Sequence, residues 1–126
     1  MLTRLRLTDF KSFRDTGELS LAPLTLLVGA NASGKSNLLD AIRFLQGISL
    51  QMPLSEVLRG RWEAGREVWP GIRGGAAEVA RMDCLSWISA GDRADQFSIV
   101  TEWRLDSTAL EHEIRCSVRA EPQVVM

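Results

Sequence analysis

The sequence is short of several residue types that mark common functional classes. Tyrosine is absent, histidine occurs once, and the two cysteines, Cys84 and Cys116, lie far apart with no C-x-x-C pair or flanking histidines. This spacing indicates neither a zinc site nor a disulfide framework and is typical of a reducing cytoplasm. The formal net charge of −1 also lacks the strong positive field of a nucleic-acid-binding domain, so any DNA contact must come from a local patch.

Long apolar runs are absent as well. The opening residues, MLTRLRLTDF, alternate in polarity and do not form the continuous apolar stretch of a signal peptide, and no run reaches membrane-spanning length. We therefore expect a soluble cytoplasmic protein with no membrane partner. A chain of 126 residues, 45% of them hydrophobic, has the size and composition of one domain, which we place at residues 1–126.

The first half of the chain carries three clear periodic patterns. Leu2 to Phe10 alternates like a strand with one solvated face, and the alternation resumes over Gly17 to Leu21, which predicts a hairpin. Leu24 to Val28 is nearly all apolar, which predicts a strand covered on both faces of a sheet. Ser36 to Gln46 has helical apolar spacing and predicts a helix that ends at Gly47.

The second half is less regular. Gly47 to Arg81 contains many arginines and glycines and is expected to be mostly irregular surface chain, with a short helix around Leu54 to Leu58. Gln96 to Leu105 and Glu111 to Ala120 alternate in polarity and predict an antiparallel hairpin. A further strand is expected at Cys84 to Ser89.

One sequence motif indicates a ligand-binding site. Residues 29–36, GANASGKS, fit the phosphate-binding P-loop pattern G-x-x-x-x-G-K-[ST], between a predicted strand and a predicted helix. Unpaired N–H groups and the positive end of the helix dipole converge there on one small volume. We expect Lys35 to reach the β and γ phosphates and the Ser36 hydroxyl to bind Mg²⁺. The expected binding residues are Gly29, Asn31, Ala32, Ser33, Gly34, Lys35, Ser36 and Asn37. The alternative is a plain strand-to-helix turn with a solvated lysine.

Three features around this loop resemble one P-loop family. They are the strand end Asp9 to Phe13 with its F-K-S-F element, Asn31 inside the loop, and the continuation Ser36 to Phe44, SNLLDAIRF. The sequence resembles the N-terminal portion of an SMC/RecF-like, ABC-type ATPase head, as in predicted bacterial AAA or OLD-like ATPases. The similarity is tight over residues 1–47 and loose over residues 48–126.

The resemblance implies an α/β fold, a partial head with a mixed sheet. It would comprise an N-terminal hairpin, P-loop strand and helix (1–47), an Arg/Gly-rich insertion (48–81) and β strands (82–126) that include the C-terminal antiparallel hairpin. It also implies ATP and Mg²⁺ as ligands, a C-terminal ATPase portion or second head in a dimer, and DNA contact through the complete assembly. DNA repair, DNA maintenance or phage defence would be the setting.

The family's remaining catalytic parts are absent from the sequence. No acidic strand end follows the P-loop, no serine–glycine signature occurs, and His112, the sole histidine, reads as an ordinary hairpin residue between two glutamates. Gln123 lies roughly where the family places a metal- and water-contacting glutamine, or is a solvated strand end. We therefore name no catalytic residue and expect the chain to bind ATP without hydrolysing it alone.

Four further residues keep two interpretations each. Phe10 and Phe13 either face the adenine or pack in the core, with packing favoured for aromatic side chains. Lys11 either approaches the nucleotide or is solvated. Arg73, in a glycine-rich stretch, either contacts DNA or an opposite head or faces solvent, which is the commoner outcome for such a loop.

Other functions also stay open. A transporter-type ATPase lobe usually has an aromatic residue, often tyrosine, ahead of the P-loop, and this chain has no tyrosine. A self-sufficient small P-loop kinase or GTPase needs an acidic end on a second buried strand, which no apolar run after Gly47 supplies convincingly. A non-catalytic module that keeps only the loop is the fourth possibility.

Overall fold

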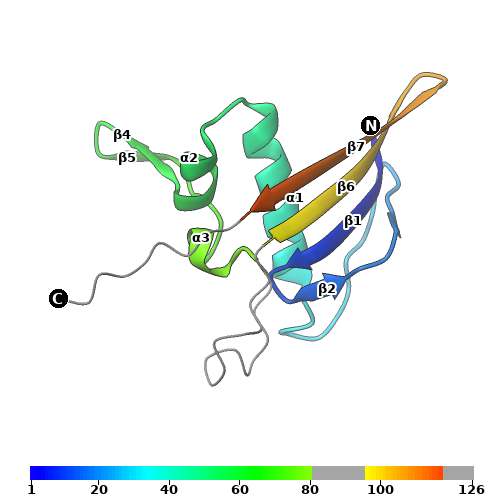
Figure 1. Cartoon of the computed structure of the whole chain (residues 1–126), viewed down its shortest axis with the longest axis horizontal. Coiled ribbons are helices and arrows are strands. Elements are labelled where there is room, and N and C mark those ends of the chain that lie inside the picture. Colours follow the sequence, from blue (N-terminus) through cyan, green and yellow to red (C-terminus); the bar gives the residue numbers. More distant parts are fainter. Residues whose placement is uncertain (81–95, 118–126) are drawn as a thin grey trace.

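An antiparallel sheet forms the frame of the protein. The computed structural model describes residues 1–80 and 96–117. The sheet has the order β2-β1-β6-β7, with β3 also paired to β1, and every pairing within it is antiparallel. Figure 1 shows the sheet with helix α1 along one face. The strands are β1 (Leu2–Phe10), β2 (Phe13–Asp15), β3 (Leu19–Ser20), β6 (Gln96–Leu105) and β7 (Thr108–Ser117).

Alternation of side chains decides which face of the sheet is covered. Leu5 and Leu7 of β1 and Ile99 of β6 are fully buried beneath α1. Arg6, between the two leucines, is on the solvated face, where its Nη2 lies 2.6 Å from Oδ2 of Asp15 in β2. The strand and N-terminal hairpin predicted from the polarity pattern are thus confirmed.

Helix α1 (Lys35–Ser49) covers the apolar face with one stripe of residues. Its Phe44 ring packs edge-on against Phe97 of β6 with ring centroids 5.6 Å apart, and Phe10 packs on Phe97 at 5.5 Å. The predicted end at Gly47 is wrong, because the helix continues through Gly47 to Ser49. Gly47 is buried against the next helix and is a packing residue rather than a stop signal.

The insertion after α1 is regular where we expected irregular chain. The short predicted helix is present, and a hairpin that the sequence reading missed follows it. Trp69 anchors this hairpin, since its side chain is 8% exposed and its indole N–H donates to the Val57 carbonyl at 3.1 Å. The elements are α2 (Leu54–Arg59), β4 (Arg61–Glu63), β5 (Arg66–Trp69) and α3 (Gly75–Glu78).

The predicted C-terminal hairpin is confirmed with a shorter turn. Strands β6 and β7 pair continuously from Gln96↔Ser117 to Leu105↔Thr108, so only residues 106 and 107 form the connection. Asp106 has φ 52°, a left-handed conformation typical of two-residue hairpin turns. The expected strand at Cys84 to Ser89 and the last three residues of the predicted Glu111 to Ala120 strand lie outside the described residues.

The predicted P-loop strand is wrong. Leu24 to Val28 forms no strand, and Leu24, Leu26 and Val28 are 90%, 85% and 80% exposed. Strand β1 is already paired along both edges, with β2 and β3 on one side and β6 on the other, so it offers this segment no edge. The expected mixed sheet is therefore an antiparallel one in the described part of the chain.

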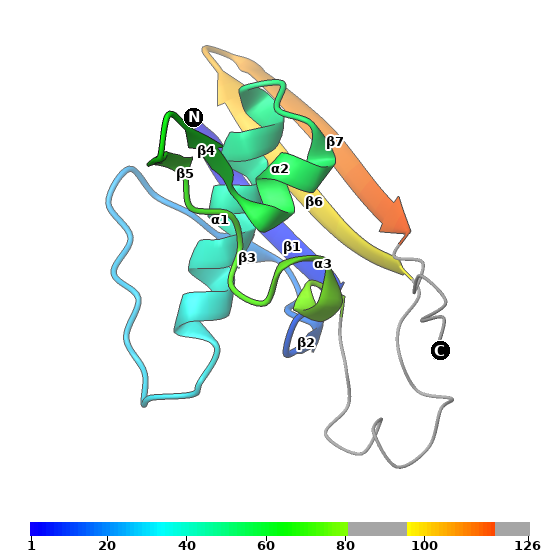
Figure 2. The ribbon, with the colours of Figure 1, turned by 90° about the vertical axis from the view of Figure 1, so that its left-hand side faces the viewer.

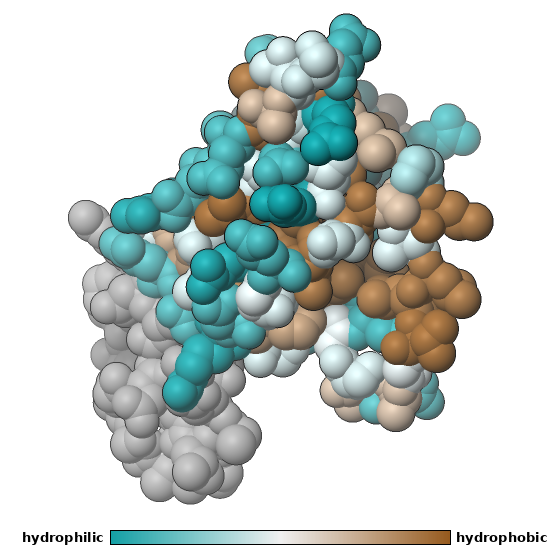
Figure 3. Space-filling model, turned by 90° about the vertical axis from the view of Figure 1, so that its right-hand side faces the viewer, coloured by the Kyte–Doolittle hydropathy of each residue, from teal (hydrophilic) through white to brown (hydrophobic). Residues whose placement is uncertain are grey.

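The figures show where this segment lies instead. In Figure 2 the light-blue chain between β3 and α1 swings wide of the sheet and the helix. Figure 3 shows apolar residues gathered on that side of the surface, consistent with the exposed leucines and valine of residues 24–28. Separately, no helix in the described ranges is long and apolar enough to cross a membrane.

Candidate functional site

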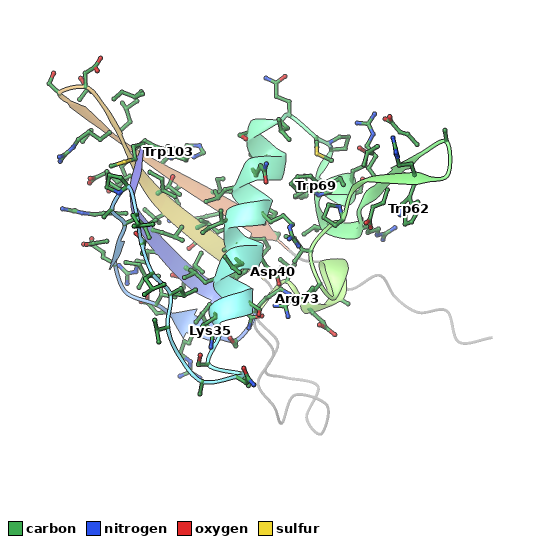
Figure 4. The ribbon with its side chains drawn as sticks, turned by 180° about the vertical axis from the view of Figure 1, so that it is seen from behind. Lys35, Asp40, Trp62, Trp69, Arg73 and Trp103 are labelled. Carbon is green, nitrogen blue, oxygen red and sulfur yellow. The ribbon has the colours of Figure 1, made fainter. Side chains whose placement is uncertain are left out.

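The loop at residues 29–36 leads directly into α1. Gly34 is the residue that caps the helix, with φ 97°, and no side chain caps the first turn. The first N–H groups of an α-helix have no partner within the helix, so they point out of the end of α1 together with the positive pole of its dipole. Figure 4 shows Lys35 at this end of α1, with Asp40 and Arg73 one turn further along.

Close neighbours surround both motif glycines, and Gly34 also has a left-handed conformation, with φ 97°. A Cβ atom on Gly29 would lie 2.7 Å from Ser33 Oγ, and one on Gly34 would lie 2.8 Å from Phe13 Cζ. The Phe13 ring thus packs against the turn that leads into α1. A tight loop with room for backbone approach is what a polyphosphate needs.

Lys35 folds back over the loop. Its ammonium group donates hydrogen bonds to the carbonyl oxygens of Gly29 and Ala30, the latter at 2.8 Å. The side chain therefore points into the concave side of the loop and is held by oxygen acceptors. Phosphate oxygens are acceptors of the same kind and carry negative charge, so they would compete well for this ammonium group.

A pocket of about 430 Å³ opens over the helix end. Six of the eight expected binding residues line it, while Gly29 and Ser33 line a neighbouring, more apolar pocket of about 320 Å³ with Phe13. The larger pocket also includes two residues that the motif did not predict, Ser12 and Arg73. The lining residues are Ser12, Ala30, Asn31, Ala32, Gly34, Lys35, Ser36, Asn37 and Arg73.

A buried ion pair lies beside this pocket. Lys11 Nζ is 2.9 Å from Asp40 Oδ2, and the two side chains are only 6% and 3% exposed. The solvated interpretation of Lys11 is wrong, because its side chain is buried; its approach to the nucleotide stays a prediction, and the side chain is not among the residues lining the pocket. Breaking one partner of such a buried pair typically costs roughly 3–5 kcal/mol, since the other charge stays behind unpaired.

Arg73 also binds Asp40, which the sequence did not predict. Its Nε and Nη2 lie 3.0 Å and 2.8 Å from Asp40 Oδ2, and Nη2 donates to Asn37 Oδ1 at 3.1 Å. Arg43, one turn further along α1, approaches the same carboxylate, with its Nη1 3.8 Å from Asp40 Oδ1. The sequence did offer one sign that Asp40 has a cationic partner. Asp40, Phe44 and Gly47 share the buried stripe of α1, and a carboxylate on a buried stripe needs cationic partners.

The other candidates have separate outcomes. Phe10 is fully buried, so core packing is confirmed for it. His112 is exposed on β7, and its main-chain carbonyl accepts a bond from Thr101 Oγ1, as expected of a hairpin residue. Gln123 lies outside the described residues. Over residues 1–80 and 96–117, no three His, Cys, Asp or Glu side chains are grouped to hold a metal ion.

The chain is similar in sequence to known proteins over part of its length. Residues 1–58 match the family model described as the RecF/RecN/SMC N terminal domain. The chromosome partition protein Smc of Cereibacter sphaeroides is 54% identical over 46 residues, 36% of this chain and 4% of that protein. The DNA replication and repair protein RecF of Agrobacterium fabrum is 34% identical over 113 residues, 87% of this chain and 28% of that protein. An ATP/GTP phosphatase of Helicobacter pylori is 38% identical over 58 residues, 46% of this chain and 15% of that protein.

The chain is thus SMC/RecF-like, as the resemblance predicted, and its similarity is to the N-terminal domain of these proteins. It spans only a small part of the relatives it matches, from 4% of the Smc protein to 28% of the RecF protein.

Proposed function

We propose that this chain is the ATP- and Mg²⁺-binding N-terminal lobe of an SMC/RecF-like ATPase. The phosphates would lie on the loop from Gly29 to Ser36, with Asn31 and Asn37 at its sides. Lys35 would bind the β and γ phosphates, and backbone N–H groups of the loop and first helical turn would supply the remaining donors.

The observation that carries the proposal is the fit of the loop to a polyphosphate. A side chain at Gly34 would collide with the Phe13 ring, so the turn into α1 requires a glycine there. The Lys35 ammonium is already turned into the loop, on the carbonyl oxygens of Gly29 and Ala30. A pocket of about 430 Å³ joins these groups to the end of α1.

The Mg²⁺ part of the proposal rests on Ser36. This residue lies in the first turn of α1 and lines the same pocket as Lys35, so its hydroxyl is available to a metal ion bound to phosphate. Mg²⁺ keeps several waters and is often held by few protein ligands together with substrate phosphates. The single Ser36 hydroxyl is consistent with this type of Mg²⁺ coordination, which requires no group of carboxylates.

We further propose that a C-terminal ATPase portion or a second head completes the site. The apolar segment from Leu24 to Val28 supports this, because its side chains are exposed and it lies next to the P-loop in sequence. Contiguous exposed apolar residues commonly mark a surface that another polypeptide covers. The names of the relatives, chromosome partition and DNA replication and repair, favour DNA maintenance or repair. Phage defence is a further setting that the names of these relatives do not mention.

Calorimetric titration with ATP and Mg²⁺ tests the proposal. We expect binding by the chain and loss of binding in Lys35→Ala, with both samples folded by circular dichroism. Arg66→Ala is the matched control, since it removes a cation from the exposed β5 hairpin, away from the pocket. Equal ATP affinity in the chain and in Lys35→Ala would reject the proposal.

A further inference from the structure

The turn between β1 and β2 is tied to its surroundings at several points. Only Lys11 and Ser12 connect the two strands, and Lys11 has φ 50°, an uncommon conformation for a lysine. Its main-chain N–H donates to the Val79 carbonyl at 2.9 Å, and its ammonium group forms the buried ion pair with Asp40 of α1. These contacts fix the turn relative to α1, and with it Phe13, the first residue of β2.

Phe13 and Gly34 are in direct contact. A Cβ atom on Gly34 would lie 2.8 Å from Phe13 Cζ and 2.9 Å from its Cε1, and the next nearest atom would be Ser12 Oγ at 3.7 Å. Ser12 Oγ also accepts a hydrogen bond from Asn37 Nδ2 in the first turn of α1, at 2.7 Å. Gly34 has φ 97°, and its carbonyl accepts a helical bond from the Leu38 N–H at 3.0 Å. The β1–β2 turn thus contacts the residue at which the P-loop becomes helix.

The Phe13 ring lies behind the P-loop as seen from the expected phosphate site. Phe13 is not among the residues lining the pocket of about 430 Å³, and it lines the apolar pocket of about 320 Å³ instead. Gly34 and Lys35 line both pockets, so the turn into α1 lies between them. Phe13 can therefore act on a phosphate only through the position of the loop. Binding groups of this kind must be held within roughly 0.5 Å of their productive positions.

We propose that Phe13 is a positioning residue for the P-loop. Its ring holds Gly34, and thereby the first N–H groups of α1 and the Lys35 side chain, in the arrangement that receives the phosphates. This inference rests on the proposed function and adds to it that the N-terminal hairpin, outside the motif, contributes to phosphate affinity. The competing interpretation is that the ring stacks on the base. The close contact with Gly34 favours the loop, because the backbone covers the ring atoms at that contact.

The test compares two ligands in the presence of Mg²⁺, ATP and inorganic tripolyphosphate, which has the phosphates without a base. Calorimetry measures the ATP dissociation constant, and competition with ATP measures that of tripolyphosphate. Phe13→Ala should weaken the binding of both ligands by a similar factor of roughly 10, which corresponds to one charged hydrogen bond. Phe13→Leu should lose less, because it keeps an apolar side chain against Gly34. Leu19→Ala is the matched control and should leave both affinities unchanged, since Leu19 lines the same apolar pocket from β3 but is not among the nearest neighbours of Gly34.

The midpoint of thermal unfolding without ligand separates positioning from stability. Phe13→Ala and Leu19→Ala should both lower this midpoint, and only Phe13→Ala should also lower the affinities. If Phe13→Ala lowers the midpoint but binds both ligands like the unmodified chain, the ring only packs in the fold and the inference is wrong. If Phe13→Ala does not fold, Phe13→Leu replaces it. A several-fold loss for both ligands in that variant would then support positioning, and full affinity would overturn it.

The base-stacking interpretation has its own outcome. If Phe13→Ala loses affinity for ATP and keeps its affinity for tripolyphosphate, the ring binds the base and the inference is wrong. It is wrong too if the unmodified chain binds ATP but not tripolyphosphate, because the phosphates would then not account for binding. In each of these cases the proposed function stands as long as Lys35→Ala abolishes ATP binding.

Discussion

Gly47 and Val57 lie so close that a Cβ atom on Gly47 would be 2.8 Å from Val57 Cγ1. The two residues form the contact between α1 and α2, and Trp69 closes it from the other side, with its Cζ2 3.1 Å from the same added atom. Gly47 therefore lets the insertion dock on α1, and docking brings Arg73 to the pocket. Close packing at this point has a measurable consequence.

Gly47→Ala should lower the free energy of unfolding by about 1–3 kcal/mol, the usual range for overpacking in a core. The change gains up to about 1 kcal/mol of helix propensity, but the Val57 methyl groups must move to make room. Urea unfolding measures the difference. In Val57→Ala the same glycine change should cost less, and equal costs in both backgrounds would contradict the contact.

The second prediction concerns the exposed apolar segment. Leu26→Ser should change the free energy of unfolding by no more than about 0.5 kcal/mol, because Leu26 is 85% exposed in the folded chain. Ile99→Ala, at a fully buried position of β6, should cost about 2–5 kcal/mol and is the positive control. A loss above 2 kcal/mol for Leu26→Ser would show that residues 24–28 pack as the sequence reading first predicted.

The same segment shows where the sequence was informative and where it was not. Alternation of polarity predicted β1 and the C-terminal hairpin, and helical apolar spacing predicted α1, because each of these elements buries one face. The apolar run at residues 24–28 indicates a tendency to be buried, but no described element covers it, and β1 is already paired along both edges. The β4–β5 hairpin was missed since β5 buries only Trp69, so no alternation marks it.

The candidate site also has a part that the sequence predicted and a part that it did not. Its P-loop could be predicted because eight consecutive residues hold the glycines, the lysine and the hydroxyl. The bond between Arg73 and Asp40 spans 33 positions in sequence and depends on how the insertion docks. No local pattern encodes such a contact.

A third prediction follows from the solvated face of the sheet. Two hydrogen bonds from Arg6 and one from the Gly17 N–H lower the pKa of Asp15 from 3.8 to about 2. A depressed carboxylate pKa contributes stability that is present above the unfolded value of 3.8 and is lost as the pH falls toward about 2. Arg6→Gln should therefore raise the Asp15 pKa part of the way to 3.8.

An NMR titration of the carboxyl carbons measures this pKa. Arg115→Gln is the control, since Arg115 lowers the pKa of Glu113 by a hydrogen bond on another part of the sheet. It should move the Glu113 pKa upward and leave that of Asp15 unchanged. An Asp15 pKa that stays near 2 in Arg6→Gln would assign the depression to the backbone N–H of Gly17 instead.

The fourth prediction tests whether the Ser36 hydroxyl binds the metal ion or the phosphate. Ser36→Ala should weaken ATP binding more in Mg²⁺ than in EDTA, because its hydroxyl is assigned to the metal ion. Ser49→Ala, near the other end of α1, should have no effect in either condition. Equal losses with Mg²⁺ and with EDTA would remove Ser36 from the metal shell.

The last prediction is that the chain binds ATP but turns it over no faster than background. Phosphoryl transfer needs an oriented water and compensation of the charge that develops around the γ-phosphate. Lys35, Ser36 and Arg73 offer cations and a metal-binding hydroxyl, yet none of them is a base that could orient water. Over residues 1–80 and 96–117 no parallel strand with an acidic end follows the P-loop, and we read no serine–glycine signature in the sequence.

Activity should therefore appear only when a C-terminal ATPase portion is joined to the chain or added in trans, so that two heads can close on the nucleotide. Steady-state phosphate release from the purified chain is the measurement, and Lys35→Ala is the control for contaminating ATPases. The added polypeptide should cover residues 24–28. A Leu26→Ser chain should therefore bind ATP normally by itself but gain less activity from the added polypeptide. Robust turnover by the chain alone, lost in Lys35→Ala, would show a complete site within these residues. It would place a small P-loop kinase or GTPase ahead of the SMC/RecF-like lobe, because such enzymes need no second head to position the attacking group.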